Sequence, residues 1–292
     1  MLAKLEMLIA LAKAQHFGRA AQSLGITQPS LSAGIRQLEE QLGVKLVLRG
    51  ARYGGLTPEG QRALIWARQI VGDTRRLREE MRASHHGLAG HLRIAVIPTA
   101  LTMAARLAAR FEKAHPAVSF TILSRSSLEI LEMLENLDVD AGITYLDVEP
   151  LGRVTCSPLY REHYALVVGA THALAGKTTL SWGQLADVKL CLLTPNMQNR
   201  RIISRNFQRA NIAPPAPVES NSTIVLIATV KEGGYATVLP REHAAFLAKG
   251  HDLEVIPIEG MDAPEIGLIV QHQEPYTPVI QALLQTVKSL SG

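Results

Sequence analysis

Residues 27–36 carry amide, hydroxyl and guanidinium side chains at helical spacing. Gln28, Ser32 and Arg36 recur every four residues, so a helix here would place them on one face. Gln and Ser side chains can hydrogen-bond to base edges, and Arg binds phosphate. The spacing therefore predicts a helix that enters the major groove of DNA. The residues expected at this surface are Arg19, Thr27, Gln28, Pro29, Ser30, Ser32, Ala33, Arg36, Arg49 and Arg52.

The flanking residues predict a helix-turn-helix that positions this face. Ala20 and Ala21 supply a small apolar surface on a first helix, and Gly25 permits the left-handed turn that follows. Thr27 is a good N-cap, and Pro29 is tolerated in the first helical turn. An apolar stripe then recurs at helical spacing and is expected to be buried. It consists of Leu31, Ile35, Leu38 and Leu42. An ordinary amphipathic helix pair is the alternative interpretation.

Residues 47–56 form two short apolar runs around a basic turn rich in glycine. This pattern predicts a β-hairpin, the wing of a winged helix. Arg49 and Arg52 would then lie beside the phosphate backbone or reach the minor groove. A solvated loop with two arginines is the alternative.

The distribution of charge agrees with a DNA-binding segment at the N-terminus. Residues 1–91 contain 13 Lys and Arg against 7 Asp and Glu, whereas residues 92–292 contain 17 against 19. The basic excess is thus confined to the first segment, as contact with phosphates requires.

Residues 58–86 contain no proline after Pro58 and two glycines, Gly60 and Gly72, and they predict a long helix capped by Thr57. Small and apolar residues alternate at spacings of four and three, which is typical of a coiled-coil seam. These are Ala63, Ala67, Ile70, Thr74, Leu77 and Met81. The seam predicts a dimer that holds two recognition helices about one DNA turn apart. A solitary surface helix is the alternative.

From residue 92 onward, apolar strands alternate with helices, which predicts parallel, doubly wound sheets. Two rounds of this pattern are followed by a strand near 266–270 and a last helix near 278–290. The chain would therefore cross twice between two α/β lobes, near 160–165 and 260–266, and leave a cleft between them.

These elements resemble, in content and order, the LysR-type transcriptional regulators of bacteria. The resemblance is sharpest in the first sixty residues. It rests there on Ala20-Ala21, Gln28-Pro29, Ser32, Leu38-Glu39, Leu42-Gly43, and Leu56-Thr57 with Gly60. It implies an α/β multidomain protein: a winged helix-turn-helix (1–57), a linker and dimerisation helix (58–86), a hinge (87–91) and a periplasmic-binding-protein-like effector domain of type II (92–292). Lobe I would comprise 92–162 and 266–292, and lobe II 163–265.

Three departures from the family pattern bear on this surface. Ala33-Gly34 replace the usual basic or polar pair, Val47-Leu48 replace Leu-Phe, and His16-Phe17 replace Ser-Phe. The first change moves the expected base readout toward Gln28, Ser32, the wing arginines and DNA shape.

In α/β sheets, ligands bind beyond the carboxyl ends of the strands, where helix N-termini offer free N–H groups. Most residues at these positions have hydroxyl or amide side chains, a lining that suits a small carboxylate or similar anion. The expected effector-binding residues are Thr99, Thr102, Ser126, Ser127, Thr144, Thr194, Pro195, Asn196 and Asn221. For each residue taken singly, N-capping is an equally good interpretation.

Other classes of protein are disfavoured. We find no catalytic carboxylate pair, nucleophile elbow or phosphate-binding glycine loop, so we expect no enzyme. His85, His86 and His91 lack a metal-ligand framework, and we expect neither metal nor cofactor. Cys156 and Cys191 fit no motif and are expected to be buried. An architectural DNA-binding protein without a ligand, and an enzyme built on the lobes, remain as alternatives.

The expected location and partners follow from the resemblance and from composition. No run of eighteen apolar residues and no leader pattern is present, so we expect a cytoplasmic protein without membrane contact. The resemblance implies promoter DNA, a homotetramer and RNA polymerase as partners, and leaves activator and repressor equally open.

Overall fold

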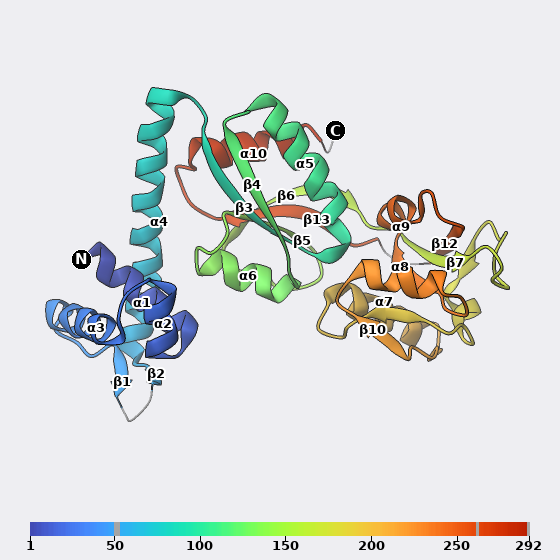
Figure 1. The fold of residues 1–292 in the computed structure, drawn as a ribbon, viewed down its shortest axis with the longest axis horizontal. Coiled ribbons are helices and arrows are strands. Elements are labelled where there is room, and N and C mark those ends of the chain that lie inside the picture. Colours follow the sequence, from blue (N-terminus) through green and yellow to red (C-terminus); the bar gives the residue numbers. More distant parts are fainter. Residues whose placement is uncertain (50–52, 261–262, 291–292) are drawn as a thin grey trace. The chain divides into compact units, whose positions relative to one another are not determined.

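The computed structural model describes residues 1–49, 53–260 and 263–290. The chain divides into two compact units, one built mainly from residues 1–89 and the other mainly from residues 90–292 (Figure 1). None of the helices in the described ranges is long and apolar enough to cross a membrane.

The first unit begins with three helices, of which the first was not anticipated from the sequence. They are α1 (Leu2–Ala14), α2 (Phe17–Ser23) and α3 (Gln28–Leu42). Leu8 and Leu11 of α1 pack with Leu31 and Leu38 of α3, and all four are fully buried. This core fixes the orientation of α3, the predicted recognition helix.

The predicted turn between α2 and α3 is confirmed. Gly25 has a φ of 66°, and Thr27 caps α3 by accepting a hydrogen bond from the Ser30 amide at 3.3 Å. His16 caps α2, since its Nδ1 accepts from the amides of Gly18 and Arg19. His16 thus performs the capping role that serine or asparagine more often fills at the start of a helix.

Two features of α3 differ from expectation. Leu42 was expected in the buried stripe, but it is 42% exposed because α3 ends there, with Gly43 in the left-handed conformation. Gly34 is buried, and a side chain at this position would meet the thioether of Met7. The absence of a polar side chain at position 34 therefore reflects the close approach of α1.

A two-stranded antiparallel hairpin and a long helix complete the first unit. The strands are β1 (Val47–Arg49) and β2 (Tyr53–Leu56), and the helix is α4 (Pro58–His86). Thr57 caps α4 as predicted, because its Oγ1 accepts from the Gly60 amide at 2.9 Å. The Thr57 hydroxyl also donates to the Lys45 carbonyl, which ties α4 to the hairpin.

The predicted seam of α4 is divided between two environments. Ala67 is fully buried and Ala63 partly buried, and both pack into the core of the first unit. Their assignment to a dimer seam was wrong, because α4 uses this face to cover α1. Ile70, Leu77 and Met81 are exposed, as is Trp66 at 63%.

The second unit begins with a five-stranded sheet in the order β4-β3-β5-β13-β6. Its strands are β3 (Gly90–Val96), β4 (Val118–Ser124), β5 (Ala141–Tyr145), β6 (Val154–Arg161) and β13 (Glu265–Gln271). Its helices are the short η1 (Pro98–Ala100), α5 (Leu101–Ala114), α6 (Ser127–Glu135) and α10 (Pro278–Lys288).

The remaining elements lie between β6 and β13 in the chain. One sheet has the strand order β11-β7-β12-β8 and consists of β7 (Tyr164–Gly169), β8 (Leu180–Ser181), β11 (Thr237–Pro240) and β12 (Leu253–Glu259). A separate pair is formed by β9 (Cys191–Leu193) and β10 (Val218–Ser220). The helices are η2 (Trp182–Leu185), α7 (Gln198–Arg209), α8 (Thr223–Lys231) and α9 (Arg241–Ala248).

The sheets are mixed, so the expectation of purely parallel sheets was wrong. β3 is parallel to β4 and β5, but β13 is antiparallel to β5 and β6, and β7 is antiparallel to β11 and β12. The antiparallel neighbours arise because β6 leaves lobe I and β13 re-enters it. Gly90 and His91, assigned above to a hinge, are already part of β3.

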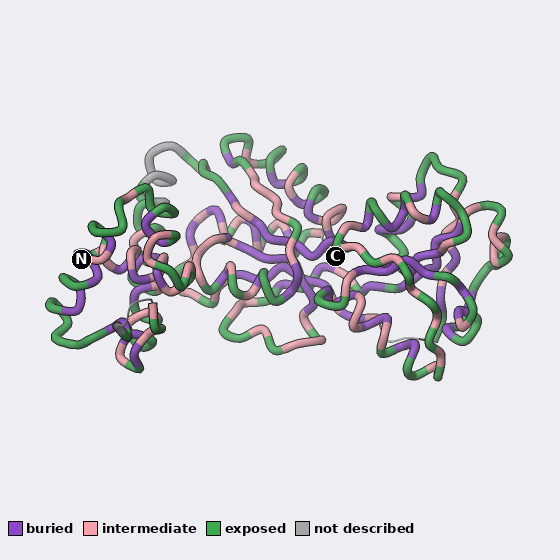
Figure 2. The backbone as a smooth tube through the Cα atoms, turned by 60° about the horizontal axis from the view of Figure 1, so that its bottom comes forward, coloured by how far each residue is buried: buried purple, intermediate pink, exposed green. Residues whose placement is uncertain are grey.

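The two crossings between the lobes lie side by side. The first crossing consists of Glu162 and His163, and the second joins β12 to β13. The amide of Glu162 donates to the carbonyl of Pro264 at 2.8 Å, so a backbone hydrogen bond joins the two crossings. Buried residues fill β5, β7 and β13, and Figure 2 shows that buried segments run through the interior of the chain while exposed ones lie at its periphery.

Candidate functional site

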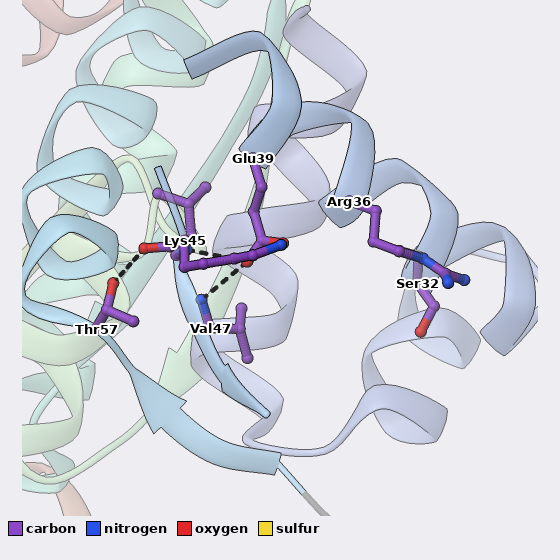
Figure 3. Close-up of polar contacts among 7 residues, drawn as sticks. Ser32, Arg36, Glu39, Lys45, Val47 and Thr57 are labelled. Atoms are coloured by element: carbon purple, nitrogen blue, oxygen red, sulfur yellow. Dashed lines mark hydrogen bonds and ion pairs between the residues drawn. The ribbon is translucent and has the colours of Figure 1, made fainter. Parts of the chain in front are cut away.

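The N-terminal part of α3 presents an accessible polar surface. Gln28, Pro29, Ser30 and Arg36 are exposed, and Ser32 and Ala33 are half-buried. Figure 3 shows Ser32 and Arg36 on one side of α3, with Glu39 pointing elsewhere, toward the hairpin. Arg36 Nε donates to the Ser32 carbonyl at 3.4 Å, which leaves the terminal nitrogens accessible. This arrangement suits base edges near the helix start and phosphate farther along.

Two of the predicted contact residues have structural partners. The Thr27 hydroxyl caps α3 and lies 2.8 Å from the Ser30 hydroxyl. Arg19 Nη2 donates to the Ala14 carbonyl at 2.9 Å, which joins α2 to the end of α1. Both residues remain exposed.

A buried carboxylate, which no sequence pattern marked as functional, connects α3 to the hairpin. Glu39 is 3% exposed, and its Oε1 accepts hydrogen bonds from the amides of Leu46 and Val47 at 3.0 and 3.3 Å (Figure 3). Lys45 Nζ lies 3.3 Å from Oε2. Glu39 therefore fixes where the hairpin starts relative to the recognition helix.

The wing arginines are placed only in part. Arg49 ends β1, but its side chain lies outside the described part of the structure. Arg52 lies outside the described residues altogether. Their contacts with DNA stay a prediction.

The second unit contains a pocket between its two lobes. Its volume is about 260 Å³. Lobe I contributes the start of α5, lobe II contributes the start of α9, and the first crossing lies between them. The lining residues are Thr99, Thr102, Met103, Arg106, Tyr160, Arg161, Glu162, His163, Pro240, Arg241, Glu242, His243 and Ala245. Thr99 and Thr102 are thus the members of the predicted effector set that line this pocket.

Glu162 is the buried acidic group of this pocket. It is 1% exposed, and its Oε2 accepts hydrogen bonds from the hydroxyls of Tyr145 and Tyr164 at 2.8 and 2.9 Å. Asn199 Nδ2 donates to the Tyr164 hydroxyl at 3.2 Å, which extends the network to α7. Burial raises the pKa of Glu162 to about 7, although these tyrosines and the nearby Thr99 hydroxyl act to lower it.

Several buried polar atoms around the pocket have no hydrogen-bond partner in the described structure. They include Glu162 Oε1, Thr99 Oγ1 and His243 Nδ1. The Nε2 atom of His243 lies 3.1 Å from the Thr223 hydroxyl, and burial lowers the His243 pKa to about 4. Buried polar groups are almost always paired in native proteins, so these atoms indicate a position for water or a ligand.

The other predicted effector residues lie away from this pocket's lining. Ser126 caps α6, since its hydroxyl accepts from the Glu129 amide at 3.4 Å, as the N-capping interpretation requires, and donates to the Glu129 carboxylate at 2.6 Å. The hydroxyls of Ser127, Thr144 and Thr194 are buried and have no partner in the described structure. The remaining members are exposed loop residues, namely Pro195, Asn196 and Asn221.

The two cysteines lie in different sheets. Cys191 in β9 is buried as expected, whereas Cys156 in β6 is exposed, so its predicted burial was wrong. Burial raises the pKa of both thiols, that of Cys191 to about 11. Because the thiolate is the reactive form, neither environment favours redox or nucleophilic chemistry. Within the described ranges, no group of three metal-ligating side chains is present.

Comparison with known proteins agrees with this architecture. Residues 2–61 match the bacterial regulatory helix-turn-helix protein family of LysR type, and residues 85–291 match the LysR substrate binding domain. The chain is 28% identical over 243 residues to the HTH-type transcriptional regulator XapR of Escherichia coli strain K12, covering 82% of each chain.

Solved structures match over nearly the whole chain. A full-length OxyR variant from Pseudomonas aeruginosa is similar with a TM-score of 0.76 and 25% identity, covering 99% of this chain and 94% of that one. Full-length CbnR in complex with its target DNA shares the fold with a TM-score of 0.62 and 21% identity, covering 99% of each. The family models together span both units, and the chain therefore belongs to the LysR family of DNA-binding transcriptional regulators.

Proposed function

We propose that this regulator reads its operator with the N-terminal face of α3 and responds to a small anionic metabolite held between the lobes of its second unit. It acts in the bacterial cytoplasm as a DNA-bound oligomer in contact with RNA polymerase. The metabolite is bound and released without chemical change.

The accessible face of α3 supports the proposal for DNA. Gln28 and Ser32 are free to contact base edges, and Arg36 is free to contact phosphate, because no ion pair holds its guanidinium among the described residues. The hairpin lies at a fixed place beside this helix, since Glu39 holds its first strand. Arg49 and Arg52 then add phosphate contacts at the flank.

Exposed apolar side chains on α4 support the proposal of a dimer. Trp66, Ile70, Leu77 and Met81 are 41–63% exposed in a single chain. Covering them with the same helix of a second copy removes this apolar area from water and pairs the two reading helices.

The single observation that carries the proposal for the effector is the interlobe pocket with its unpartnered buried groups. Thr99 lies at the start of the lobe I helix, where N–H groups favour a negative charge, and three arginines line the same pocket. A ligand that contacts both lobes stabilises one arrangement over another, and this difference in affinity drives the response.

The test compares Thr99→Val with the wild type, and Thr194→Val, whose hydroxyl lies outside the lining of the pocket, is the control. Valine keeps the shape and removes the hydroxyl, so DNA binding without effector should be unchanged. DNase footprints of the region upstream of the gene, with and without a panel of small carboxylic acids, give the response. Thr99→Val is expected to abolish it. If Thr99→Val responds like the wild type, the effector does not bind through this hydroxyl and the pocket is misplaced.

The same panel separates the two alternatives from the proposal. An architectural DNA-binding protein would show no change in melting temperature with any acid. An enzyme would consume the acid, which mass spectrometry of the recovered ligand would detect.

A further inference from the structure

The interlobe pocket is lined by one buried carboxylate and by exposed charged side chains, which we call its rim. Glu162 is 1% exposed, near the buried hydroxyl of Thr99. The rim contains Arg106, Arg161 and Arg241, together with the exposed Glu242. Arginines alone would be enough to bind a simple anion. The presence of a buried carboxylate in the same pocket therefore needs a separate explanation.

The two oxygens of Glu162 differ. Oε2 accepts from both Tyr145 and Tyr164, whereas Oε1 is buried and has no partner at hydrogen-bond geometry among the described residues, the nearby Thr99 hydroxyl included. A buried carboxylate oxygen without a donor is costly, and the tyrosines are already committed to the other oxygen. Oε1 is therefore placed to accept a hydrogen bond from something that enters the pocket.

The arginines of the rim differ as well. Arg161 lies 3.7 Å from Glu265 and donates to the Ala263 carbonyl, and Arg106 lies 4.0 Å from Glu242. The Arg241 guanidinium is exposed and forms no ion pair within the described residues. The backbone of Arg241 is anchored, because its amide donates to the His163 carbonyl at 2.7 Å. Arg241 is thus an available partner for a carboxylate, carried on an anchored stretch of backbone.

We propose that Glu162 determines the class of ligand in this pocket, which takes a small carboxylic acid that also carries a hydroxyl or ammonium group. The donor group of the ligand binds Glu162 Oε1, and its carboxylate binds Arg241. This inference rests on the proposed function, since it assumes that the interlobe pocket holds the effector. The volume of about 260 Å³ limits the ligand to a few carbon atoms beyond these groups.

An acid without a donor group fits this chemistry poorly. It would leave Glu162 Oε1 unpaired and bring a second negative charge near a buried carboxyl group. A site built to hydrogen-bond a ligand group discriminates strongly against analogues that lack it, because the protein group is then left unpaired.

The first experiment uses the wild-type full-length protein and matched acids. Propionate is compared with lactate and alanine, and butyrate with 3-hydroxybutyrate, by calorimetric titration and melting temperature. The hydroxy or amino acid is expected to bind at least about tenfold more tightly than its plain counterpart, as a hydrogen bond to a charged group implies. Lactate and alanine distinguish a hydroxyl from an ammonium donor.

The second experiment identifies the groups responsible. Glu162→Gln keeps the size but replaces one carboxylate oxygen with a donating NH2 group and removes the negative charge. It should therefore weaken substituted acids, tighten plain acids and so abolish the preference between them. Arg241→Gln should weaken every acid about tenfold or more. Glu232→Gln, at an exposed position outside the pocket, is the control and should behave like the wild type.

The outcomes separate this inference from the proposed function. Equal binding of plain and substituted acids, weakened by Arg241→Gln, overturns the role of Glu162 but retains the pocket. A preference that survives in a folded Glu162→Gln protein also overturns it. If no acid in the series binds, both the inference and the proposed pocket fail. If Glu162→Gln does not fold, the comparison of matched acids on the wild-type protein still tests whether the pocket prefers acids with a donor group.

Discussion

The two sites of this chain use polar groups in opposite ways. On α3 the predicted DNA-contacting side chains Gln28 and Arg36 are exposed, and water satisfies them until DNA arrives. In the interlobe pocket Thr99 and Glu162 are buried, and each has a polar atom without a partner in the described structure. The first site can be assembled from one segment, whereas the second needs groups that distant segments bring together.

This contrast explains the roles of the two buried glutamates. Both carboxylate oxygens of Glu39 have partners inside its own domain, namely two backbone amides and Lys45. Glu162 has partners at one carboxylate oxygen, whereas the other oxygen is unpaired among the described residues. A saturated buried carboxylate fixes a local geometry, whereas an unsaturated one indicates a place for an incoming group.

The largest expected effect is on the saturated site. Glu39→Ala leaves the buried amides of Leu46 and Val47 without acceptors, which costs roughly 2–6 kcal/mol of stability in the first unit. Operator binding should fall with it, because the hairpin loses its anchor. Thermal melts with circular dichroism and operator titrations check this, and Glu40→Ala at the exposed neighbour is the control. Unchanged stability would show that Glu39 does not hold the hairpin.

The second effect concerns the pairing of chains. Leu77→Lys places a charge in the apolar face proposed to pair two copies of α4, and dimer stability should fall by several kcal/mol. Gln61→Lys adds the same charge at another exposed position of α4 and should leave the dimer intact. Light scattering at micromolar concentration distinguishes them. An intact Leu77→Lys dimer would rule out this helix as the main contact.

The third effect is a dependence of stability on pH in the second unit. The pKa of Glu162 is about 7 when folded against 4.5 when unfolded, so folding becomes less favourable as pH rises from 4.5 to 7. The loss of stability corresponds to about 3 kcal/mol and is complete above pH 7. Glu162→Gln should remove this dependence, which urea unfolding at pH 5 and pH 8 measures. His243 has the opposite effect. Its pKa is about 4 when folded and 6.5 when unfolded, so the unfolded chain binds a proton first and stability falls as pH drops below 6.5.

If the stability of Glu162→Gln changes between pH 5 and pH 8 as much as that of the wild type, Glu162 does not titrate in this range. Tyr145, Tyr164 and Asn199 would then hold its charged form more firmly than its burial indicates.

The smallest effect tests the readout of bases. Gln28→Ala should cost roughly 1–3 kcal/mol on the specific operator and little on random duplex, whereas Arg52→Ala should weaken both and flatten the salt dependence. Gln37→Ala, exposed on the opposite side of α3, is the control. Titrations at two salt concentrations provide the comparison. Equal losses on both duplexes for Gln28→Ala would exclude base reading by this side chain.

Much of the first unit was predictable because its signals are local. The cap at Thr27, the turn at Gly25 and the start of α4 each depend on a few consecutive residues, and all three are confirmed. The errors concern faces of helices: Ala63 and Ala67 fit a seam by spacing alone, and only the packing of α1 shows that they belong to the core.

The interlobe pocket was harder to predict, for a physical reason. Thr99 and Thr102 could be inferred because they start a helix after a strand. Glu162 and Arg241 lie 79 positions apart, and neither belongs to a sequence motif. They meet because the chain crosses between lobes, which spacing does not reveal. An acidic residue next to a predicted crossing is the signal that could have found Glu162.

The packing of α4 limits how this protein can be recombined with its relatives. Ala67 and Val71 belong to the core of the DNA-binding unit, and a side chain at Gly60 would collide with the Leu46 carbonyl. A chimaera joined at residue 57, where the hairpin ends, would take Ala67 and Val71 out of that core. The α1 and α3 residues would then have to pack against a helix from another protein. A chimaera that exchanges operator specificity therefore needs its junction beyond Val71, so that the first part of α4 stays with the DNA-binding unit against which it packs.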